Sequence, residues 1–151
     1  MEKRNLGNKG TKVGALGIGA MSFSDFYGPT NTQESHAILK MALDNGIDHI
    51  DTAKVYGMGL SEERIGQFLN TLNPKDRQFF KIATKGGIDR KNFDDKGTVV
   101  FDNSKEFLTE ELNNSLRRLG VDCVELYYVH RREADRPVSY THLTLPTSHG
   151  V

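Results

Sequence analysis

The chain has 151 residues, of which 36% are hydrophobic and 26% charged, a balance typical of soluble globular proteins. Lysine plus arginine equals aspartate plus glutamate at 20 each, so the overall charge gives no attraction to nucleic acid or to an anionic membrane surface. We therefore expect a small ligand held by local groups, with no nucleic-acid or membrane partner.

The N-terminal segment has charged residues and glycines where a secretory signal peptide has an unbroken apolar core, and no apolar run approaches the length of a membrane span. A cytoplasmic location is therefore the expectation. The single cysteine, Cys123, has no partner for an internal disulfide. Its apolar neighbours Val121, Val124 and Leu126 predict a buried, small apolar side chain rather than a reactive thiol.

The first half of the chain alternates strand and helix signals. Glycines punctuate the first 19 residues, which predicts a small β-hairpin leading into a strand near residues 15–19. Asn31 and Glu34 have the spacing of a capping box, and the helix that they begin is expected to stop at Gly46. Three further elements follow from periodicity: a strand at 46–51, a helix at 61–72 and a strand at 78–84.

After a long polar loop, Asn103 and Glu106 repeat the capping-box spacing and predict a third helix, which Gly120 ends. The fourth strand fits residues 123–129. The connections between strands are too long for hairpins, which predicts parallel strands joined by right-handed crossovers. This α/β pattern fits both a doubly wound sheet and part of a (β/α)8 barrel.

Ionisable side chains follow three of these strands at their carboxyl ends. Asp51, Lys85 and His130 each stand where a strand ends, and Tyr56 lies in the loop behind Asp51. Because the carboxyl ends of parallel strands share one edge of a sheet, where binding sites are built, we expect the four to converge. Taken singly, each also fits an ordinary structural role, as a helix cap, a solvated lysine, a rim aromatic or a satisfied polar residue.

The four groups together have one economical chemical interpretation, proton donation by a phenol. A phenol with a pKa near 10 is a poor donor at neutral pH unless a nearby cation stabilises its phenolate. Lys85 would be that cation, and Asp51 would hold the ammonium in place. His130 would orient a substrate carbonyl or relay the proton. Tyr56 would then be a general acid.

Four motifs, in this order, closely resemble those of the aldo-keto reductases: "GIGAMSFSDFYG", "HIDTAKVYGMGLSEERIG", "KIATKGG" and "SLRRLGVDCVELYYVHR". The resemblance covers about residues 4–137. It implies a (β/α)8 TIM barrel of which this chain is the N-terminal half, NADPH bound without a Rossmann domain, and hydride transfer to an aldehyde or ketone. The family's catalytic tetrad falls on Asp51, Tyr56, Lys85 and His130.

The resemblance also implies a cofactor role for the end of the first strand. Four residues correspond to positions near the cofactor in the family: Gly19, Ala20, Met21 and Asp51. Close packing of strand and turn is the alternative for the first three. The glycines of "GALGIG" lack the G-x-G-x-x-G order of a Rossmann phosphate loop, and no helix start follows them.

Two other short patterns predict nothing beyond local structure. The "GMG" segment at residues 57–59 predicts a turn. Asp94 and Asp95 have no ligand-like pattern around them, so we expect no metal site.

Two other functions share parts of the pattern. A barrel aldolase would use Lys85 to form a Schiff base with its substrate, but it needs no tyrosine five residues beyond an aspartate. A regulatory subunit on the reductase scaffold would keep the tetrad and the cofactor site while sensing a nicotinamide. The expected small partner is a carbonyl compound, and the sequence carries no signal for an oligomeric state.

The last part of the chain changes character. A complete eight-stranded barrel takes about 250 residues, whereas only four strands are predicted here. Residues 138–151 contain no lysine, arginine, aspartate or glutamate, and residues 138–147 resemble a translated sequencing-library adapter. We therefore expect a partial aldo-keto reductase barrel domain over residues 1–137 and a non-native tail over residues 138–151. The full-length parent would be an enzyme, and the fragment inactive.

Overall fold

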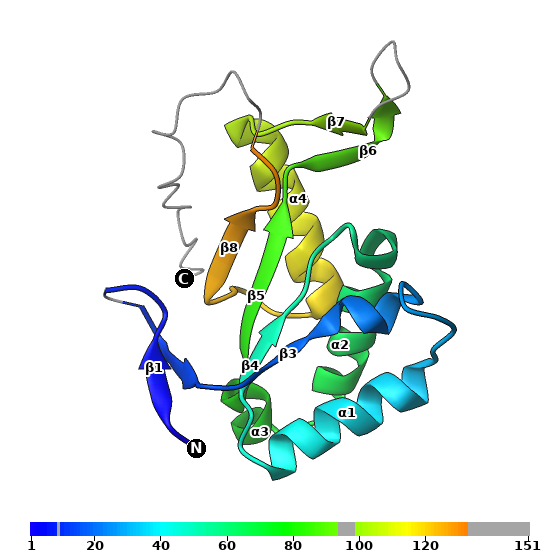
Figure 1. The fold of residues 1–151 in the computed structure, drawn as a ribbon. Coiled ribbons are helices and arrows are strands. Elements are labelled where there is room, and N and C mark those ends of the chain that lie inside the picture. The colour runs from blue at the N-terminus through cyan, green and yellow to red at the C-terminus, as the bar shows by residue number, and fades with distance from the viewer. Residues whose placement is uncertain (9, 94–98, 133–151) are drawn as a thin grey trace.

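A computed structural model describes residues 1–8, 10–93 and 99–132. Four parallel strands form its central sheet, in the order β3, β4, β5, β8 (Figure 1). Their bounds are Gly17–Gly19, His49–Asp51, Lys81–Gly86 and Leu126–Val129. The strands are neighbours in chain order, without the reversal that defines a doubly wound sheet. The fold is therefore the α/β arrangement of a half barrel, as the sequence predicted.

Three helices of eleven residues or more connect the strands: α1 (Thr32–Asp44), α2 (Leu60–Asn70) and α4 (Lys105–Leu119). The apolar core lies between these helices and one face of the sheet, and Ile50 and Ile82 supply its strand side. Side chains alternate across a strand, so Asp51 and Lys85 point to the opposite face. This alternation keeps the candidate site residues out of the apolar core.

The capping box of α1 is confirmed. The Asn31 side chain accepts a hydrogen bond from the Glu34 N–H at 2.9 Å, and the Glu34 carboxylate accepts from the Asn31 N–H at 3.3 Å. The box predicted at Asn103 and Glu106 is wrong by one residue. Ser104 caps α4 by accepting from the Phe107 N–H at 3.3 Å, while Asn103 donates to the Arg131 carbonyl at 3.0 Å.

The predicted hairpin is present as β1 (Lys3–Asn5) and β2 (Lys12–Gly14), which pair antiparallel. Asp48, just before β4, joins this hairpin to the sheet. Its buried carboxylate accepts a hydrogen bond from the Gly14 N–H at 2.6 Å and forms an ion pair with Lys3. The hairpin therefore lies at the amino end of the sheet, opposite the strand ends that carry the candidate site (Figure 1).

Several elements differ from the predictions. A short helix, α3 (Pro74–Phe79), occupies part of the stretch predicted as strand, because Asn73 caps it and proline favours its first position. The predicted polar loop contains an antiparallel pair, β6 (Ile88–Phe93) and β7 (Val99–Phe101). Cys123 is exposed rather than buried, because β8 begins only at Leu126 and leaves the cysteine in the preceding loop.

No helix among the described residues is both long and apolar enough to cross a membrane. The predicted tail at residues 138–151 lies outside the described residues, as do Asp94 and Asp95. Within the described part of the chain, no cluster of three or more histidine, cysteine, aspartate or glutamate side chains is suited to hold a metal ion.

Candidate active site

Lys85, at the carboxyl end of β5, is the centre of the site. Its ammonium forms an ion pair with Asp51, donates to the Thr52 carbonyl at 2.8 Å and donates to the phenolic oxygen of Tyr56 at 3.2 Å. The ammonium also lies 4.9 Å from the centre of the Tyr56 ring. The Lys85 side chain is 14% exposed, so these partners replace much of the water that a free ammonium would have.

The backbone explains how Asp51 and Tyr56 reach the same lysine. Hydrogen bonds continue beyond the end of β4, from the Thr52 N–H to the Ala83 carbonyl at 2.9 Å and from the Lys54 N–H to the Lys85 carbonyl at 3.3 Å. The loop after Asp51 therefore follows β5 as far as Lys85. It then turns into the short 3-10 helix η2 (Tyr56–Gly59), which places the phenol beside the ammonium.

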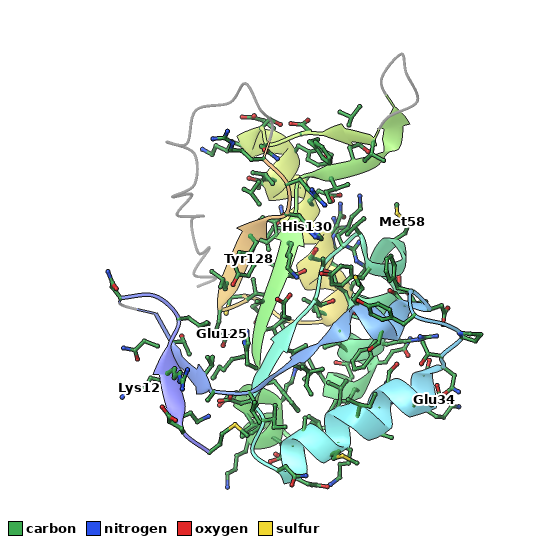
Figure 2. The ribbon with its side chains drawn as sticks, in the orientation of Figure 1. Lys12, Glu34, Met58, Glu125, Tyr128 and His130 are labelled. Atoms are coloured by element: carbon green, nitrogen blue, oxygen red, sulfur yellow. The ribbon has the colours of Figure 1, made fainter. Side chains whose placement is uncertain are left out.

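His130 joins the site from the next strand. Its N–H donates to the Gly86 carbonyl at 2.8 Å, which extends the pairing of β5 with β8 by one residue. The imidazole meets the Tyr56 ring edge to face, with centroids 5.8 Å apart and planes at 88°. Its Nδ1 is buried and has no hydrogen-bond partner among the described residues. Figure 2 shows His130 at the end of the sheet where β5 ends.

The His130 imidazole is neutral at pH 7. Burial lowers its pKa below the ordinary value of 6.5, the positive charges of Lys85 and Arg131 lower the pKa further, and the negative charge of Asp51 partly opposes them. A neutral imidazole has one nitrogen that donates and one that accepts a hydrogen bond. It can therefore hold a polar oxygen in place without adding a second positive charge beside Lys85.

The structure thus brings together the three side chains that the sequence placed at strand ends and Tyr56 from the loop behind Asp51. A cation within hydrogen-bond reach of a phenol stabilises the phenolate, and so makes the phenol a better proton donor. The Asp51 side chain, which pairs with the same ammonium, is 41% exposed. The arrangement can deliver a proton to a substrate oxygen. The roles of the four residues remain predictions.

The end of β3 provides open space next to this group. Gly19 pairs with Asp51 in the parallel register, and a Cβ added at Gly19 would meet nothing within 4 Å. Close packing therefore does not account for this glycine. Ala20 is buried, because it begins the short 3-10 helix η1 (Ala20–Ser24), and its carbonyl accepts from the Ser61 hydroxyl at 2.8 Å. The open space beside Asp51 is compatible with a bound cofactor.

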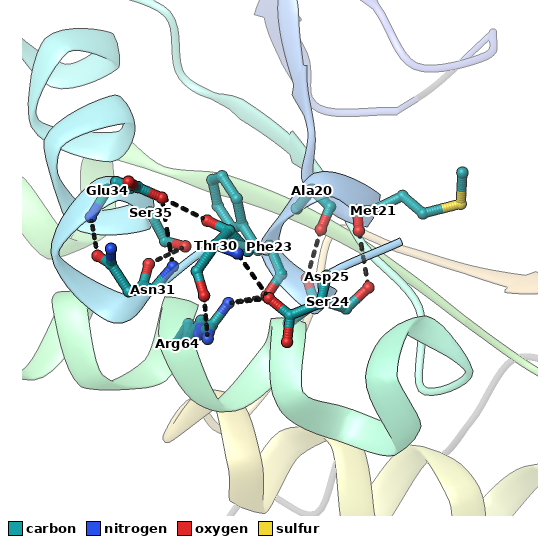
Figure 3. Close-up of polar contacts among 11 residues, drawn as sticks. Ala20, Met21, Phe23, Ser24, Asp25, Thr30, Asn31, Glu34, Ser35 and Arg64 are labelled. Carbon is teal, nitrogen blue, oxygen red and sulfur yellow. Dashed lines mark hydrogen bonds and ion pairs between the residues drawn. The ribbon is translucent and has the colours of Figure 1, made fainter. Parts of the chain in front are cut away.

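Arg64 fixes the loop that follows η1, a role that the sequence did not reveal. From within α2, its buried guanidinium donates to the Phe23 carbonyl at 2.6 Å and to the Thr30 carbonyl at 3.2 Å, and lies 3.9 Å from the Asp25 carboxylate (Figure 3). Asp25 itself adopts a left-handed φ of 61° and accepts from the Thr30 N–H at 2.8 Å. These contacts hold both ends of the loop between η1 and α1.

A buried charged cluster lies behind the site, between the sheet and two helices. Glu62 of α2 is fully buried, where it accepts from the Thr84 hydroxyl at 2.6 Å and from Arg118 of α4 at 2.7 Å. The Lys54 ammonium lies 3.1 Å from a Glu111 carboxylate oxygen, an ion pair without hydrogen-bond geometry. Nothing local in the sequence marks this acid in the first turn of α2 as buried.

Comparisons with known proteins identify the family of the chain. The sequence profile of the Aldo/keto reductase family matches residues 15–146. The chain is 34% identical over 135 residues to an aldo-keto reductase of Schizosaccharomyces pombe that is named for NADP(+), and the match covers 89% of the chain and 38% of that protein. It is 33% identical over 141 residues to an Arabidopsis thaliana protein named as a voltage-gated potassium channel subunit beta, with coverages of 93% and 40%.

Among solved structures, the fold is similar to the holo form of an aldo-keto reductase from Bacillus halodurans. The TM-score is 0.76 at 34% sequence identity, and the likeness covers 93% of this chain and 44% of that one. The chain therefore spans about two fifths of the length of the curated relatives that it matches. Residues 15–146, which the family profile matches, include the positions of all the site residues described above.

Proposed function

The chain belongs to the aldo/keto reductase family, and on this basis we propose that the complete protein is an NADPH-dependent reductase of aldehydes or ketones with Tyr56 as its general acid. One observation supports this assignment above the others. The Lys85 ammonium donates to the Tyr56 oxygen at 3.2 Å while it is paired with Asp51. The phenol and its stabilising cation are thus already in contact.

In the proposed reaction, a carbonyl compound gains two electrons and two hydrogens. NADPH, when bound, supplies the hydride that forms the new bond to the carbonyl carbon. Tyr56 gives its proton to the carbonyl oxygen, and the product is an alcohol. Lys85 stabilises the phenolate left on Tyr56, and Asp51 holds the ammonium in position. Solvent returns a proton to Tyr56 after the product leaves.

We assign His130 to orientation of the substrate carbonyl. Its ring packs edge to face on Tyr56, and its pKa lies below 6.5, so it is an uncharged hydrogen-bonding group next to the proton donor. A buried nitrogen without a partner is unfavourable by about 1–3 kcal/mol, and hydrogen bonding of the ring to a substrate oxygen after a small reorientation would remove that cost.

Gly19, Ala20, Met21 and Asp51 are the proposed cofactor contacts in this part of the protein. Support comes from the open space over Gly19 beside Asp51, from the NADP(+) in the name of the yeast relative, and from the holo form of the bacterial structure. These residues would hold the nicotinamide end close to Tyr56, where the substrate carbonyl has to lie.

The test is turnover by the complete protein that carries this chain. NADPH absorbance at a fixed cofactor concentration should fall on addition of a simple aldehyde and should stay constant without it. The 151-residue chain should show no such turnover, since its described sheet has four of the eight strands of a barrel. Substitution of NADH for NADPH in the same assay measures the cofactor preference.

A regulatory subunit that senses a nicotinamide is the second candidate, because the chain is also 33% identical to a protein named as a potassium channel subunit. Such a protein would bind NADPH without appreciable turnover on any aldehyde. A Schiff-base aldolase has less support, since the Lys85 ammonium is engaged by three partners. A covalent lysine adduct trapped by borohydride would revive that function.

A further inference from the structure

Residues 57–59 form a left-handed turn immediately after Tyr56. The φ and ψ angles are 64° and 29° at Gly57, 55° and 36° at Met58, and 106° and −11° at Gly59. The sequence predicted only a turn here. Left-handed φ values are common for glycine and unfavourable for a methionine, whose Cβ approaches the following carbonyl. Met58 is therefore the strained residue of the turn.

Packing explains the two glycines that flank it. A Cβ on Gly57 would lie 2.7 Å from the Ser24 Cβ, and a Cβ on Gly59 would lie 2.7 Å from the Arg118 Cδ. The backbone of the turn is thus held between η1 on one side and α4 on the other. These contacts fix the conformation of Met58, but they do not require a methionine, since glycine or asparagine adopts the same angles more easily.

The position of Met58 suggests what its side chain does. It is two residues from the proposed proton donor, and the residue is 47% exposed. In Figure 2, Met58 and His130 lie at the same end of the sheet, and the Met58 side chain projects away from the ribbon. Strained non-glycine residues that the surroundings hold in place cluster at functional sites. An unbranched thioether is flexible enough to fit apolar groups of different shapes.

We propose that Met58 is a specificity-determining residue, whose side chain contacts the apolar part of the substrate. The preferred substrates are then aldehydes and ketones that carry an apolar chain or ring next to the carbonyl. This inference rests on the proposed reductase function. It predicts that binding of the substrate body, and not proton transfer, depends on the methionine, because the contact that supports the Tyr56 hydroxyl comes from Lys85 and does not involve Met58.

The experiment is a kinetic series on the complete protein. Straight-chain aldehydes from propanal to octanal are compared, with glyceraldehyde as the polar reference. In the wild type, kcat/KM should increase with chain length. In Met58→Ala, the ratio of kcat/KM for octanal to that for propanal should fall by about tenfold, mainly through KM. Met58→Leu, which conserves volume, should keep most of the ratio.

Two control variants test whether the effect comes from contact between the Met58 side chain and the substrate. The alternatives are the backbone strain at Met58 and the loss of any exposed methionine. Met58→Gly relaxes the backbone and also removes the side chain, so it should lose the chain-length preference as Met58→Ala does. If Met58→Ala folds poorly, the chain-length preference is measured on Met58→Gly instead. Met41→Ala removes an exposed methionine of α1, which is 66% exposed, and should leave the ratio unchanged.

The outcomes distinguish the inference from the function on which it rests. If the wild type reduces none of the aldehydes, the proposed reductase function fails. If the wild type reduces them without any preference for longer chains, the inference about Met58 is wrong and the reductase function stands. The same conclusion follows if both Met58→Ala and Met58→Gly keep the wild-type ratio.

Discussion

Lys85 donates a hydrogen bond to the phenolic oxygen of Tyr56 across 3.2 Å, although the two residues are 29 positions apart in the chain. Parallel pairing of β4 with β5 produces this contact, because the loop after Asp51 stays hydrogen-bonded to β5 up to Lys85. The phenol and the ammonium therefore form one unit, and changes to either should affect the same step.

Lys85→Met should lower the rate of carbonyl reduction, because the phenolate of Tyr56 would lose its stabilising cation. Its effect should not add to that of Tyr56→Phe, since residues that act as a unit are strongly non-additive. A double-mutant cycle on kcat measures this. Lys81→Met is the matched control, since Lys81 starts the same strand but pairs with Glu125 at 3.6 Å. Fully additive effects would contradict the account.

His130 should limit the reaction only at acid pH. Its pKa in the folded protein is below 6.5, so more than half of the imidazole is still neutral at pH 6.5 and the ring becomes mainly charged only at lower pH. The acid limb of kcat/KM that belongs to His130 should therefore lie below pH 6.5. The pH profiles of wild type and His130→Gln measure it, and the limb should be absent from the variant. A His130-dependent limb above pH 6.5 would show that the ring is charged more easily than its burial implies.

Asp48 should make stability sensitive to acid. Burial alone would raise its pKa, but hydrogen bonds from Lys3 and the Gly14 N–H, with the charge of Lys3, lower it below 3.8. The unfolded state then binds a proton first, so the stabilisation is complete above about pH 4 and is lost as the pH falls through the folded pKa.

Urea unfolding of the chain at several pH values tests this prediction. Asp48→Ala should reduce the free energy of unfolding by about 2 kcal/mol at pH 7, the usual effect of losing hydrogen bonds to a charged group. The difference from wild type should shrink in strong acid. Exposed Asp44→Ala, which removes an i, i+4 pair with Lys40, should cost much less.

Gly57→Ala should destabilise the turn that carries Tyr56. Its φ of 64° is unfavourable for alanine, and the new Cβ would lie 2.7 Å from the Ser24 Cβ, so a loss of about 1–3 kcal/mol is expected. Gly46→Ala is the matched control: its φ is 71°, but a Cβ there meets nothing within 4 Å. Urea unfolding should show a clearly larger loss for Gly57→Ala. Equal losses would mean that contact with Ser24 is unimportant.

The site could be predicted from sequence to the extent that strand ends define it. Asp51, Lys85 and His130 follow apolar strands, and in a parallel sheet this local fact is enough to bring them to one edge. Arg64 and Glu62 could not be recognised in this way. Each is an ordinary polar residue of a helix, and its role depends on backbone carbonyls or on Thr84 and other side chains far away in the chain.

The same reasoning explains the errors in the fold. The Asn103 cap was misplaced because Ser104, the next residue, offers an equally good capping hydroxyl. Cys123 was expected in a strand from its apolar neighbours, but an apolar run does not show where pairing begins. The left-handed turn at Met58 had no signal beyond its flanking glycines, since its conformation is fixed by Ser24 and Arg118.

The measurement that tests the central claim most directly is carbonyl reduction by Tyr56→Phe in the complete protein. The change removes the hydroxyl and keeps the ring that packs on His130, so NADPH binding, followed by fluorescence titration, should be preserved. Reduction of a good aldehyde, followed by NADPH absorbance, should fall by roughly 100-fold to 10,000-fold, the usual range for loss of a positioned general acid. Tyr128→Phe, a neighbouring exposed tyrosine on β8, should retain wild-type activity. Near-normal reduction by Tyr56→Phe would contradict its role as proton donor.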